Sequence, residues 1–393
     1  MIVSERMMKI ASWAFMALLA LGSIPPASAA DPYTIDILLP LTGPAAYAGK
    51  LEEQAAHVYE TVVNKGGGIH GQPVHFNIHD DQGSPVVAVQ IVNDLLPKHP
   101  VAILGPSFAA TCAATSPLFV NGPVNFCFSP LLLPPRGGYV FATAPPIRDI
   151  VFSIFNRARV LGFKNIAVLA TTDASGLQQI EYSKDALALP ANRGLKLVAL
   201  ESYAPSAVSI SAQIAKIKAA NPDFIGLWAT GAAFGTAVRE LYNAGLNVAV
   251  YASPSGASEA QLAESAAVLP SVLLTGGLPY QGKIQDPSLK AAANEYLDGM
   301  KFASLKPESM QAYSWDPIRL TVTALQHLPA GATPTQLRDY LLNLHGFAGV
   351  FGIYDFRTGD QHGLSGVDLP FLQWDAARKT WTSFERIPPN IPK

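Results

Sequence analysis

Short apolar runs alternate with longer stretches of helical periodicity along most of the chain. The first pair is YTIDILLP (33–40), followed by the helical stretch 45–65. Nearly continuous apolar strands separated by helices are typical of parallel sheets that are covered on both faces. The pattern therefore predicts an α/β fold. The further apolar runs lie at 74–80, 101–105, 124–129, 139–143, 165–171, 196–202, 223–230, 247–253 and 271–277.

The number of predicted strands bears on the domain organisation. A single sheet of ten or more strands is unusual, so two doubly wound lobes account for the pattern better. The chain has 393 residues, of which 49% are hydrophobic, and this is ample for two buried cores. After 276–282 the pattern becomes helical, and it ends on β-like runs at 349–356 and 369–375.

The N-terminal segment has the order of a secretory signal peptide. Arg6 and Lys9 flank the start of the apolar run 10–24, and a small-residue Ala-Ser-Ala tripeptide ends at Ala29. The apolar run is too short to span a bilayer comfortably. The sequence predicts a signal peptide over 1–29, export to the periplasm and no stable membrane insertion. A membrane anchor is the alternative interpretation.

Charge and cysteine content narrow the function classes. The formal net charge is −2 and no run of lysine or arginine stands out, which argues against a nucleic-acid partner. The two cysteines are Cys112 and Cys127. One falls in the first turns of a predicted helix and the other on the next strand, and an oxidising compartment permits a disulfide between them. We expect that disulfide, with two free thiols as the alternative.

Motifs of enzymes and metal sites are weak in this sequence. There is no G-x-S-x-G elbow and no G-x-G-x-x-G after a strand, and the glycines of 64–71 lack the Gly-Lys-Ser/Thr ending of a phosphate loop. His75 and His79 stand four apart on a predicted strand, where solvated or edge positions suit them better than a metal site. The sequence predicts neither an enzyme nor a cofactor nor a metal; a hydrolase is the remaining enzymatic alternative.

Small polar residues follow several of the predicted strands. In open α/β sheets, ligands bind beyond the carboxyl ends of the strands, close to helix N-termini that suit anions. Each such residue alone is explained by an ordinary helix cap or turn, but their number favours a shared polar cleft. They are Ser107, Ser129 with Pro130, and the segments 171–176, 229–235 and 253–258.

Five segments, taken in order, resemble a known family. They are LPLTGPAAYAGK (39–50), the long segment 62–96 with its Gly-Gly-Ile and Asp-Asp, AILGPSFAAT (102–111), FCFSP (126–130) and GFAGVFGIYDF (346–356). Together they resemble the type I periplasmic binding proteins, specifically the leucine/isoleucine/valine-binding branch that serves ABC importers.

The resemblance implies two Rossmann-like lobes joined by three hinge crossings and closing on a ligand. It also implies a small-molecule carboxylate ligand, the permease subunits of an ABC transporter as partners, and a monomer. A ligand carboxylate would lie against the small residues that follow Gly105. The crossings are expected near 143–148, 277–280 and 346–349, with lobe one as 31–145 plus 279–347 and lobe two as 146–278 plus 348–393.

Several positions depart from the family's pattern. The serine of the first helical turn is Ala109 here, the second ligand loop is apolar from Leu131 onward, and the second-lobe tyrosine is Ser175. The loop 253–258 also lacks the glutamate with which amino-acid binders of the family pair the ligand's ammonium. These departures favour an aromatic or otherwise apolar acid, as in the branch that binds benzoate derivatives.

The predicted ligand-binding residues combine the strand-end positions with those carried over from the family. Asp173 is a possible substitute acid and Arg148 a possible cation. There are two alternatives to a receptor for apolar acids: an amino-acid receptor, and a ligand sensor on the same fold. The predicted set is Tyr47, Ser107, Phe108, Ala109, Thr111, Ser129, Pro130, Leu131, Arg148, Asp173, Ser175, Thr230, Gly231, Ser255 and Tyr280.

Overall fold

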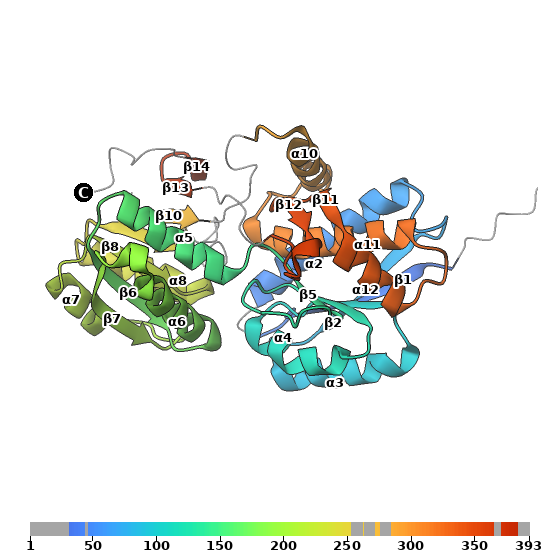
Figure 1. Ribbon diagram of the computed structural model, residues 1–393, viewed down its shortest axis with the longest axis horizontal. Coiled ribbons are helices and arrows are strands. Elements are labelled where there is room, and N and C mark those ends of the chain that lie inside the picture. Colours follow the sequence, from blue (N-terminus) through green and yellow to red (C-terminus); the bar gives the residue numbers. More distant parts are fainter. Residues whose placement is uncertain are drawn as a thin grey trace, which may run out of the picture.

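The computed structural model describes residues 31–43, 46–252, 262, 272–275, 284–364 and 371–383. The predicted signal peptide, Ser255 and Tyr280 lie outside the described residues. Two lobes stand side by side (Figure 1), each built on its own sheet with helices on both faces. The prediction of a mixed α/β fold with two doubly wound lobes is confirmed.

The first lobe is built on a parallel sheet in the order β2-β1-β3-β4-β5. Its helices α3 and α4 lie below the sheet in the view of Figure 1, and α2, α11 and α12 lie above it. The strands are β1 (Tyr33–Leu39), β2 (Val74–Asp80), β3 (Ala102–Leu104), β4 (Val124–Cys127) and β5 (Val140–Ala142). The helices are α2 (Ala46–Lys65), α3 (Pro85–Leu95), η2 (Leu96–Lys98), α4 (Ala109–Thr115), η3 (Ser116–Phe119), α10 (Pro287–Phe302), α11 (Ser309–His327), α12 (Pro334–Asn343) and η6 (Phe356–Thr358).

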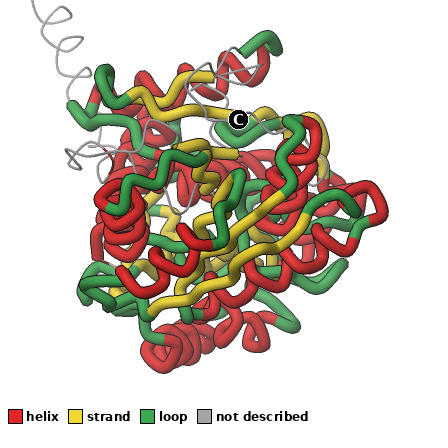
Figure 2. The backbone as a smooth tube through the Cα atoms, turned by 90° about the vertical axis from the view of Figure 1, so that its left-hand side faces the viewer, coloured by secondary structure: helices red, strands yellow, loops and turns green. Residues whose placement is uncertain are grey.

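The second lobe is built on a sheet in the order β14-β13-β10-β9-β8-β6-β7, which is parallel from β10 to β7. Figure 2 looks onto this lobe and shows its strands flanked by helices on both sides. The strands are β6 (Asn165–Thr171), β7 (Lys196–Tyr203), β8 (Phe224–Trp228), β9 (Ala249–Ala252), β10 (Val272–Thr275), β13 (Phe371–Asp375) and β14 (Thr380–Ser383). The helices are α5 (Ile147–Val160), α6 (Ala174–Ala188), η4 (Pro190–Asn192), α7 (Ser211–Ala219) and α8 (Gly231–Asn243).

Separate cores hold the two lobes. In the first lobe, Ile37 and Phe126 of the sheet pack with Trp315 of α11. In the second lobe, α5 and α6 cover one face of the sheet and α7 and α8 cover the other. The strands β3 and β8 are buried along their whole length, which explains why they are continuous apolar runs rather than alternating ones.

One predicted domain boundary was wrong. The segment after 348 was assigned to the second lobe, but β11 (His345–Ala348) and β12 (Ile353–Asp355) form a small antiparallel pair that belongs to the first lobe. The buried carboxylate of Asp316 on α11 accepts the main-chain N–H groups of Val350 at 2.8 Å and Phe351 at 3.1 Å. Tyr354 donates to the same carboxylate at 2.9 Å. The first lobe therefore extends to Leu364, and the second lobe resumes with β13.

The chain passes from the first lobe to the second between β5 and α5. β5 pairs with β4 in the first lobe, whereas Ile147 at the start of α5 packs in the core of the second lobe. The crossing expected at 277–280 falls outside the described residues. Among the residues described, no helix combines the length and the apolar character that crossing a membrane requires.

Candidate functional site

A cavity lies between the two lobes. It contains about 160 Å³ of space that the centres of water molecules can reach. The first lobe contributes Tyr47 from α2, the segments 107–110 and 128–131 from the loops after β3 and β4, and Met310 and Tyr313 from α11. The second lobe contributes 173–175 at the start of α6 and Thr230 before α8. The cleft predicted from the strand ends therefore exists, and it is lined from both sides.

The structure brings ten of the predicted ligand-binding residues onto this cavity wall. The carboxyl ends of the parallel strands in each lobe face the space between the lobes, so the loops that follow those strands converge there. The ten are Tyr47, Ser107, Phe108, Ala109, Ser129, Pro130, Leu131, Asp173, Ser175 and Thr230.

The turn after β3 is held tightly against β1. Gly105 has a φ of +79°, and a Cβ on it would lie 2.2 Å from the carbonyl oxygen of Leu38. Only glycine has both the conformational freedom and the small size that this position needs. Ser107 and Phe108 follow this turn directly, and both line the cavity.

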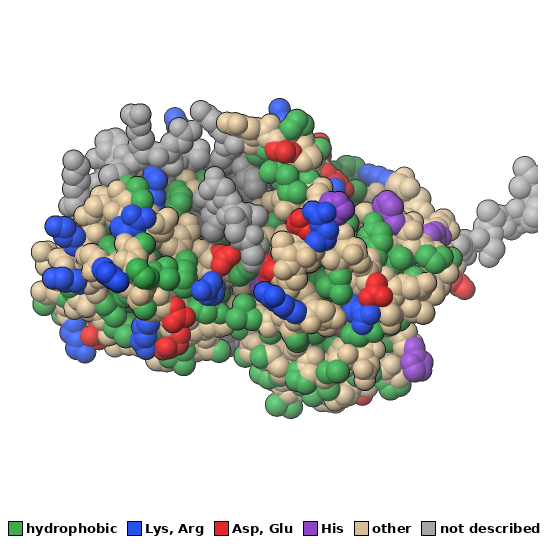
Figure 3. Space-filling view, viewed as in Figure 1, with side chains coloured by type: hydrophobic (Ala, Val, Ile, Leu, Met, Phe, Trp, Pro, Cys, Tyr) green, Lys and Arg blue, Asp and Glu red, His purple; other side chains and the backbone are tan. Residues whose placement is uncertain are grey.

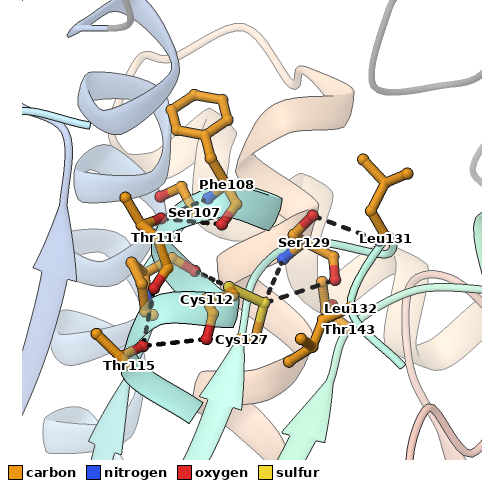
Figure 4. Close-up of a disulfide and its surroundings, with 12 residues drawn as sticks. Ser107, Phe108, Thr111, Cys112, Thr115, Cys127, Ser129, Leu131, Leu132 and Thr143 are labelled. Atoms are coloured by element: carbon orange, nitrogen blue, oxygen red, sulfur yellow. Dashed lines mark hydrogen bonds between the residues drawn. A yellow bond between two sulfur atoms is a disulfide. The ribbon is translucent and has the colours of Figure 1, made fainter. Parts of the chain in front are cut away.

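A disulfide joins the two first-lobe elements that adjoin the cavity-lining segments 107–110 and 128–131. It joins Cys112 on α4 to Cys127 on β4, with the Cα atoms 5.8 Å apart (Figure 4). The main-chain N–H of Ser129 donates to the Cys127 sulfur at 3.3 Å. Figure 4 shows Phe108 and Leu131 pointing away from the disulfide on the same side. The covalent link thus holds the two segments in a fixed relative position.

Two predicted residues lie away from the cavity wall. Thr111 is fully buried, and its hydroxyl donates to the Phe108 carbonyl at 2.9 Å and accepts the Phe108 N–H at 3.3 Å, so it caps the first turn of α4. The guanidinium of Arg148 lies 4.2 Å from the centre of the Phe152 ring and 3.8 Å from the Asp149 carboxylate. Arg148 lies on the exposed side of α5, because Ile147 and Ile150 occupy the side that packs on the core.

Asp173 uses its carboxylate within its own turn. One oxygen accepts the Gly176 N–H at 2.9 Å, the Ser175 hydroxyl at 2.8 Å and the Thr171 hydroxyl at 3.0 Å. These bonds make Asp173 the N-cap of α6. These bonds occupy its Oδ1 atom, so the prediction that Asp173 pairs with a ligand ammonium depends on the other oxygen of the carboxylate.

Contacts between the lobes surround the cavity. The Tyr47 side chain lies against Gly231 of the second lobe, where an added Cβ would be 3.5 Å from the Tyr47 hydroxyl oxygen, and burial raises the pKa of that hydroxyl to about 12. The side-chain amide of Gln178 on α6 donates to the Leu131 carbonyl at 3.2 Å. Leu131 itself packs against the second-lobe core. Gly231 was predicted as a ligand residue, and here it contacts a first-lobe side chain.

Sequence reasoning missed Glu52, which lies behind the cavity wall. Glu52 is wholly buried on α2, and the Ser107 hydroxyl forms a short hydrogen bond with its Oε2 atom. Its Oε1 atom has no hydrogen-bond partner among the described residues. Burial is the largest cause that raises the pKa of Glu52 to about 8, and the charge of Asp81 adds to it. The sequence contains one indication that Glu52 is buried. It stands three and four positions before Ala55 and Ala56, on the apolar side of the helix.

Five further lining residues are absent from the predicted set: Ala110, Phe128, Ala174, Met310 and Tyr313. Met310 and Tyr313 come from α11, far along the chain from the loops that the strand-end argument identifies. They reach the cavity because α11 packs beside α2 in the first-lobe core. Their helical spacing is that of ordinary core residues, so no local pattern distinguished them.

The described residues include no group of three or more histidine, cysteine, aspartate or glutamate side chains that could hold a metal ion. The Nε2 atom of His79 lies 2.8 Å from the Asp36 carboxylate, which gives that histidine a structural partner.

On the face shown in Figure 3, lysine and arginine side chains are spread over both lobes with acidic side chains among them.

Comparison with known proteins places the chain among relatives of similar length. A family model described as "Periplasmic binding protein" matches residues 32–379. The Leu/Ile/Val-binding protein homolog 3 of Brucella melitensis is 25% identical over 384 residues, covering 93% of this chain and 96% of that protein. A leucine-, isoleucine-, valine-, threonine- and alanine-binding protein of Pseudomonas aeruginosa is 24% identical, covering 93% and 96% of the two chains.

Solved structures share the fold. An extracellular ligand-binding receptor from Rhodopseudomonas palustris superposes with a TM-score of 0.78 at 21% identity, covering 90% of this chain and 99% of that one. A putative branched-chain amino acid ABC transporter protein from Rhodospirillum rubrum gives a TM-score of 0.63 at 21% identity, with 90% and 100% covered.

Proposed function

This chain belongs to the periplasmic binding protein family, and from that premise we propose that it is the substrate-binding receptor of an ABC importer. We propose further that it captures a small carboxylate with an aromatic or otherwise apolar body. The observation that carries this proposal is the chemistry of the cavity wall. Phe108, Phe128 and Leu131 line it, and the one acidic side chain among its described lining residues, Asp173, caps its own helix.

An energetic argument disfavours an α-amino acid as the ligand. An α-amino acid would bring its ammonium into a closed cleft, and leaving a buried charge without a partner costs about 3–5 kcal/mol. The loop 253–258, where the family places a glutamate, reads Ser-Pro-Ser-Gly-Ala-Ser. A carboxylate is better provided for, because the Ser129 hydroxyl, which keeps its hydrogen, and the main-chain N–H groups of 109–110 at the start of α4 line the cavity.

A receptor for branched-chain or other amino acids is the second candidate. It is favoured by the names of the two curated relatives: one is a Leu/Ile/Val-binding protein homolog, and the other a leucine-, isoleucine-, valine-, threonine- and alanine-binding protein. The same fold also serves as a sensor domain, in which case the partner would be a signalling protein rather than a permease.

The proposed receptor works outside the cytoplasm. The signal sequence over 1–29 would direct export and be cleaved after Ala29, and the mature monomer would deliver its ligand to the permease subunits. Closure of the two lobes over the cavity would present the loaded form.

A thermal-shift screen tests this function. A ligand that binds only the folded protein raises the melting temperature as its concentration rises. The panel contains benzoate, hydroxybenzoates and cinnamate beside leucine, valine, alanine and glutamate. We expect the aromatic acids to raise the melting temperature more than any amino acid at equal concentration. A larger shift with an amino acid would favour the second candidate, and no shift with any acid would contradict the proposal.

A further inference from the structure

The Ser107 hydroxyl lies between the ligand cavity and a buried carboxyl group. Ser107 lines the cavity, and its Oγ atom forms a short hydrogen bond with Oε2 of Glu52. Glu52 has no exposed surface, its Oε1 atom lacks a hydrogen-bond partner, and no lysine or arginine within the described residues forms an ion pair with it. The cavity thus has a titratable group directly behind its wall.

The protonation state of Glu52 decides what Ser107 offers to a ligand. A serine hydroxyl has one hydrogen to donate. When Glu52 is ionised, that hydrogen is held by Oε2, and Ser107 presents only lone pairs to the cavity. When Glu52 is protonated, its own O–H donates to Oγ, and the serine hydrogen is free to point into the cavity. The first state suits a donor in the ligand, and the second suits an acceptor such as a carboxylate.

We infer that Glu52 and Ser107 act as a proton-controlled selector, in which a carboxylate ligand binds at Ser107 only when Glu52 carries a proton. The inference rests on the proposed function, because it assumes a carboxylate ligand. At a pH where Glu52 is ionised in the unliganded protein, ligand binding then takes up one proton from the solvent. The proton adds to a Glu52 carboxylate oxygen, and the ligand keeps its negative charge.

The groups that face Glu52 are consistent with this role. Asp81, in the loop after β2, contributes a further negative charge, and burial raises its own pKa to about 6. Tyr47 on α2 has its pKa raised to about 12, and burial raises the pKa of Tyr313 on α11 above its usual range. From α11, the Ser314 hydroxyl also donates to the Glu52 main-chain carbonyl at 3.1 Å. Of these groups, Glu52 is the one that titrates near pH 8.

A ligand titration across pH tests the inference. Benzoate is titrated into the wild-type protein and the E52Q variant between about pH 6 and pH 9 by calorimetry, in two buffers of different ionisation enthalpy to count protons. The wild-type affinity for benzoate should fall about tenfold from pH 7 to pH 9, because the fraction of protein in which Glu52 is protonated falls by about the same factor. Proton uptake should rise toward one per benzoate bound.

The E52Q variant is the matched control. Its amide donates to Ser107 Oγ as the protonated acid does, so its benzoate affinity should change less than about twofold over the same range, with no proton uptake. Ser107→Ala supplies a second variant. It removes the hydroxyl that responds to Glu52, so benzoate should bind about three- to tenfold more weakly at pH 6.

The outcomes separate this inference from the proposed function. Benzoate binding with the same pH profile in wild type and E52Q, and without proton uptake, would overturn the selector while leaving the receptor proposal in place. If leucine binds and benzoate does not, the aromatic assignment is wrong. The selector is then tested by the same comparison of wild type and E52Q with leucine, since leucine also presents a carboxylate. Binding of neither acid would overturn both.

Discussion

The side-chain amide of Gln178, on α6 of the second lobe, donates to the main-chain carbonyl of Leu131, on the first lobe, over 3.2 Å. This bond crosses the cleft beside the cavity, so it exists only while the lobes are close together. A conformation in which the lobes separate loses it together with the contact between Tyr47 and Gly231. The closed conformation is therefore stabilised by direct contacts between the lobes.

Removing the Gln178 amide should weaken ligand binding. A hydrogen bond of this kind contributes about 0.5–1.5 kcal/mol, so Q178A should bind its ligand roughly two- to tenfold more weakly. Q213A is the matched control, because its amide donates to the Ser202 carbonyl at 3.3 Å within the second lobe. Equal affinities of Q178A and Q213A, measured by titration with the ligand of highest affinity, would show that the cross-lobe bond does not support closure.

Gly231 should tolerate alanine poorly. Its φ is +57°, and a Cβ would lie 3.3 Å from the Tyr47 ring. The left-handed conformation costs a non-glycine residue about 1–2 kcal/mol, and the tyrosine must also move. G231A should therefore lower both the free energy of unfolding and the ligand affinity.

Gly235, in the same helix, is the control for that change. A Cβ there meets no atom within 4 Å, and alanine favours a helix interior over glycine by about 1 kcal/mol. Urea unfolding should show G235A to be at least as stable as the wild type. A G231A variant as stable as G235A would refute the structural account of this helix start.

Glu52 should make the folded protein less stable as pH rises. Its pKa is raised from 4.5 to about 8 in the folded state, so across this window the folded protein holds a proton that the unfolded chain has released. Unfolding then releases the proton, and its free energy falls by about 1.4 kcal/mol per pH unit. The E52Q variant lacks this contribution.

The measurement is urea unfolding at about pH 5.5 and pH 7.5. E52Q should gain roughly 2–3 kcal/mol relative to the wild type between these pH values. E53Q, at the half-buried neighbouring position on α2, controls for the loss of one negative charge. A constant difference between E52Q and the wild type would mean that Glu52 is ionised in the folded protein throughout.

The disulfide should contribute measurably to stability. It closes a loop with a sequence separation of 15, for which the chain-entropy model gives about 3 kcal/mol. Reductant should therefore lower the free energy of unfolding of the wild type and leave the C112A/C127A double variant unchanged. Two free thiols in the denatured, unreduced protein would contradict the assignment.

The sequence predicted the parts of the site that follow from topology. Parallel strands place their carboxyl ends at one edge of a sheet, and residues that follow those ends were predicted to line a cleft. Such residues do line the cavity: Ser107, Ser129, Asp173 and Thr230. Tyr47 was found through the family resemblance, because nothing in its own neighbourhood marks it.

The parts that were missed depend on which way a side chain faces and on distant packing. Arg148 was expected near the ligand, but the apolar side of α5 turns it outward. The boundary after 348 was misplaced because Asp316, far from it in sequence, holds the segment in the first lobe. Glu52 was passed over since a glutamate in a helix is ordinarily solvent-exposed.

The central claim is that the cavity between the lobes takes an apolar carboxylate in preference to an amino acid. Calorimetric titration of the exported, mature protein with benzoate-type acids and, in parallel, with leucine, isoleucine and valine tests it most directly. An unpaired ammonium in the cleft would cost about 3–5 kcal/mol, so we predict that an aromatic acid binds at least about tenfold more tightly than any of the three amino acids. Tighter binding of leucine, isoleucine or valine would contradict the claim and identify the protein as an amino-acid receptor.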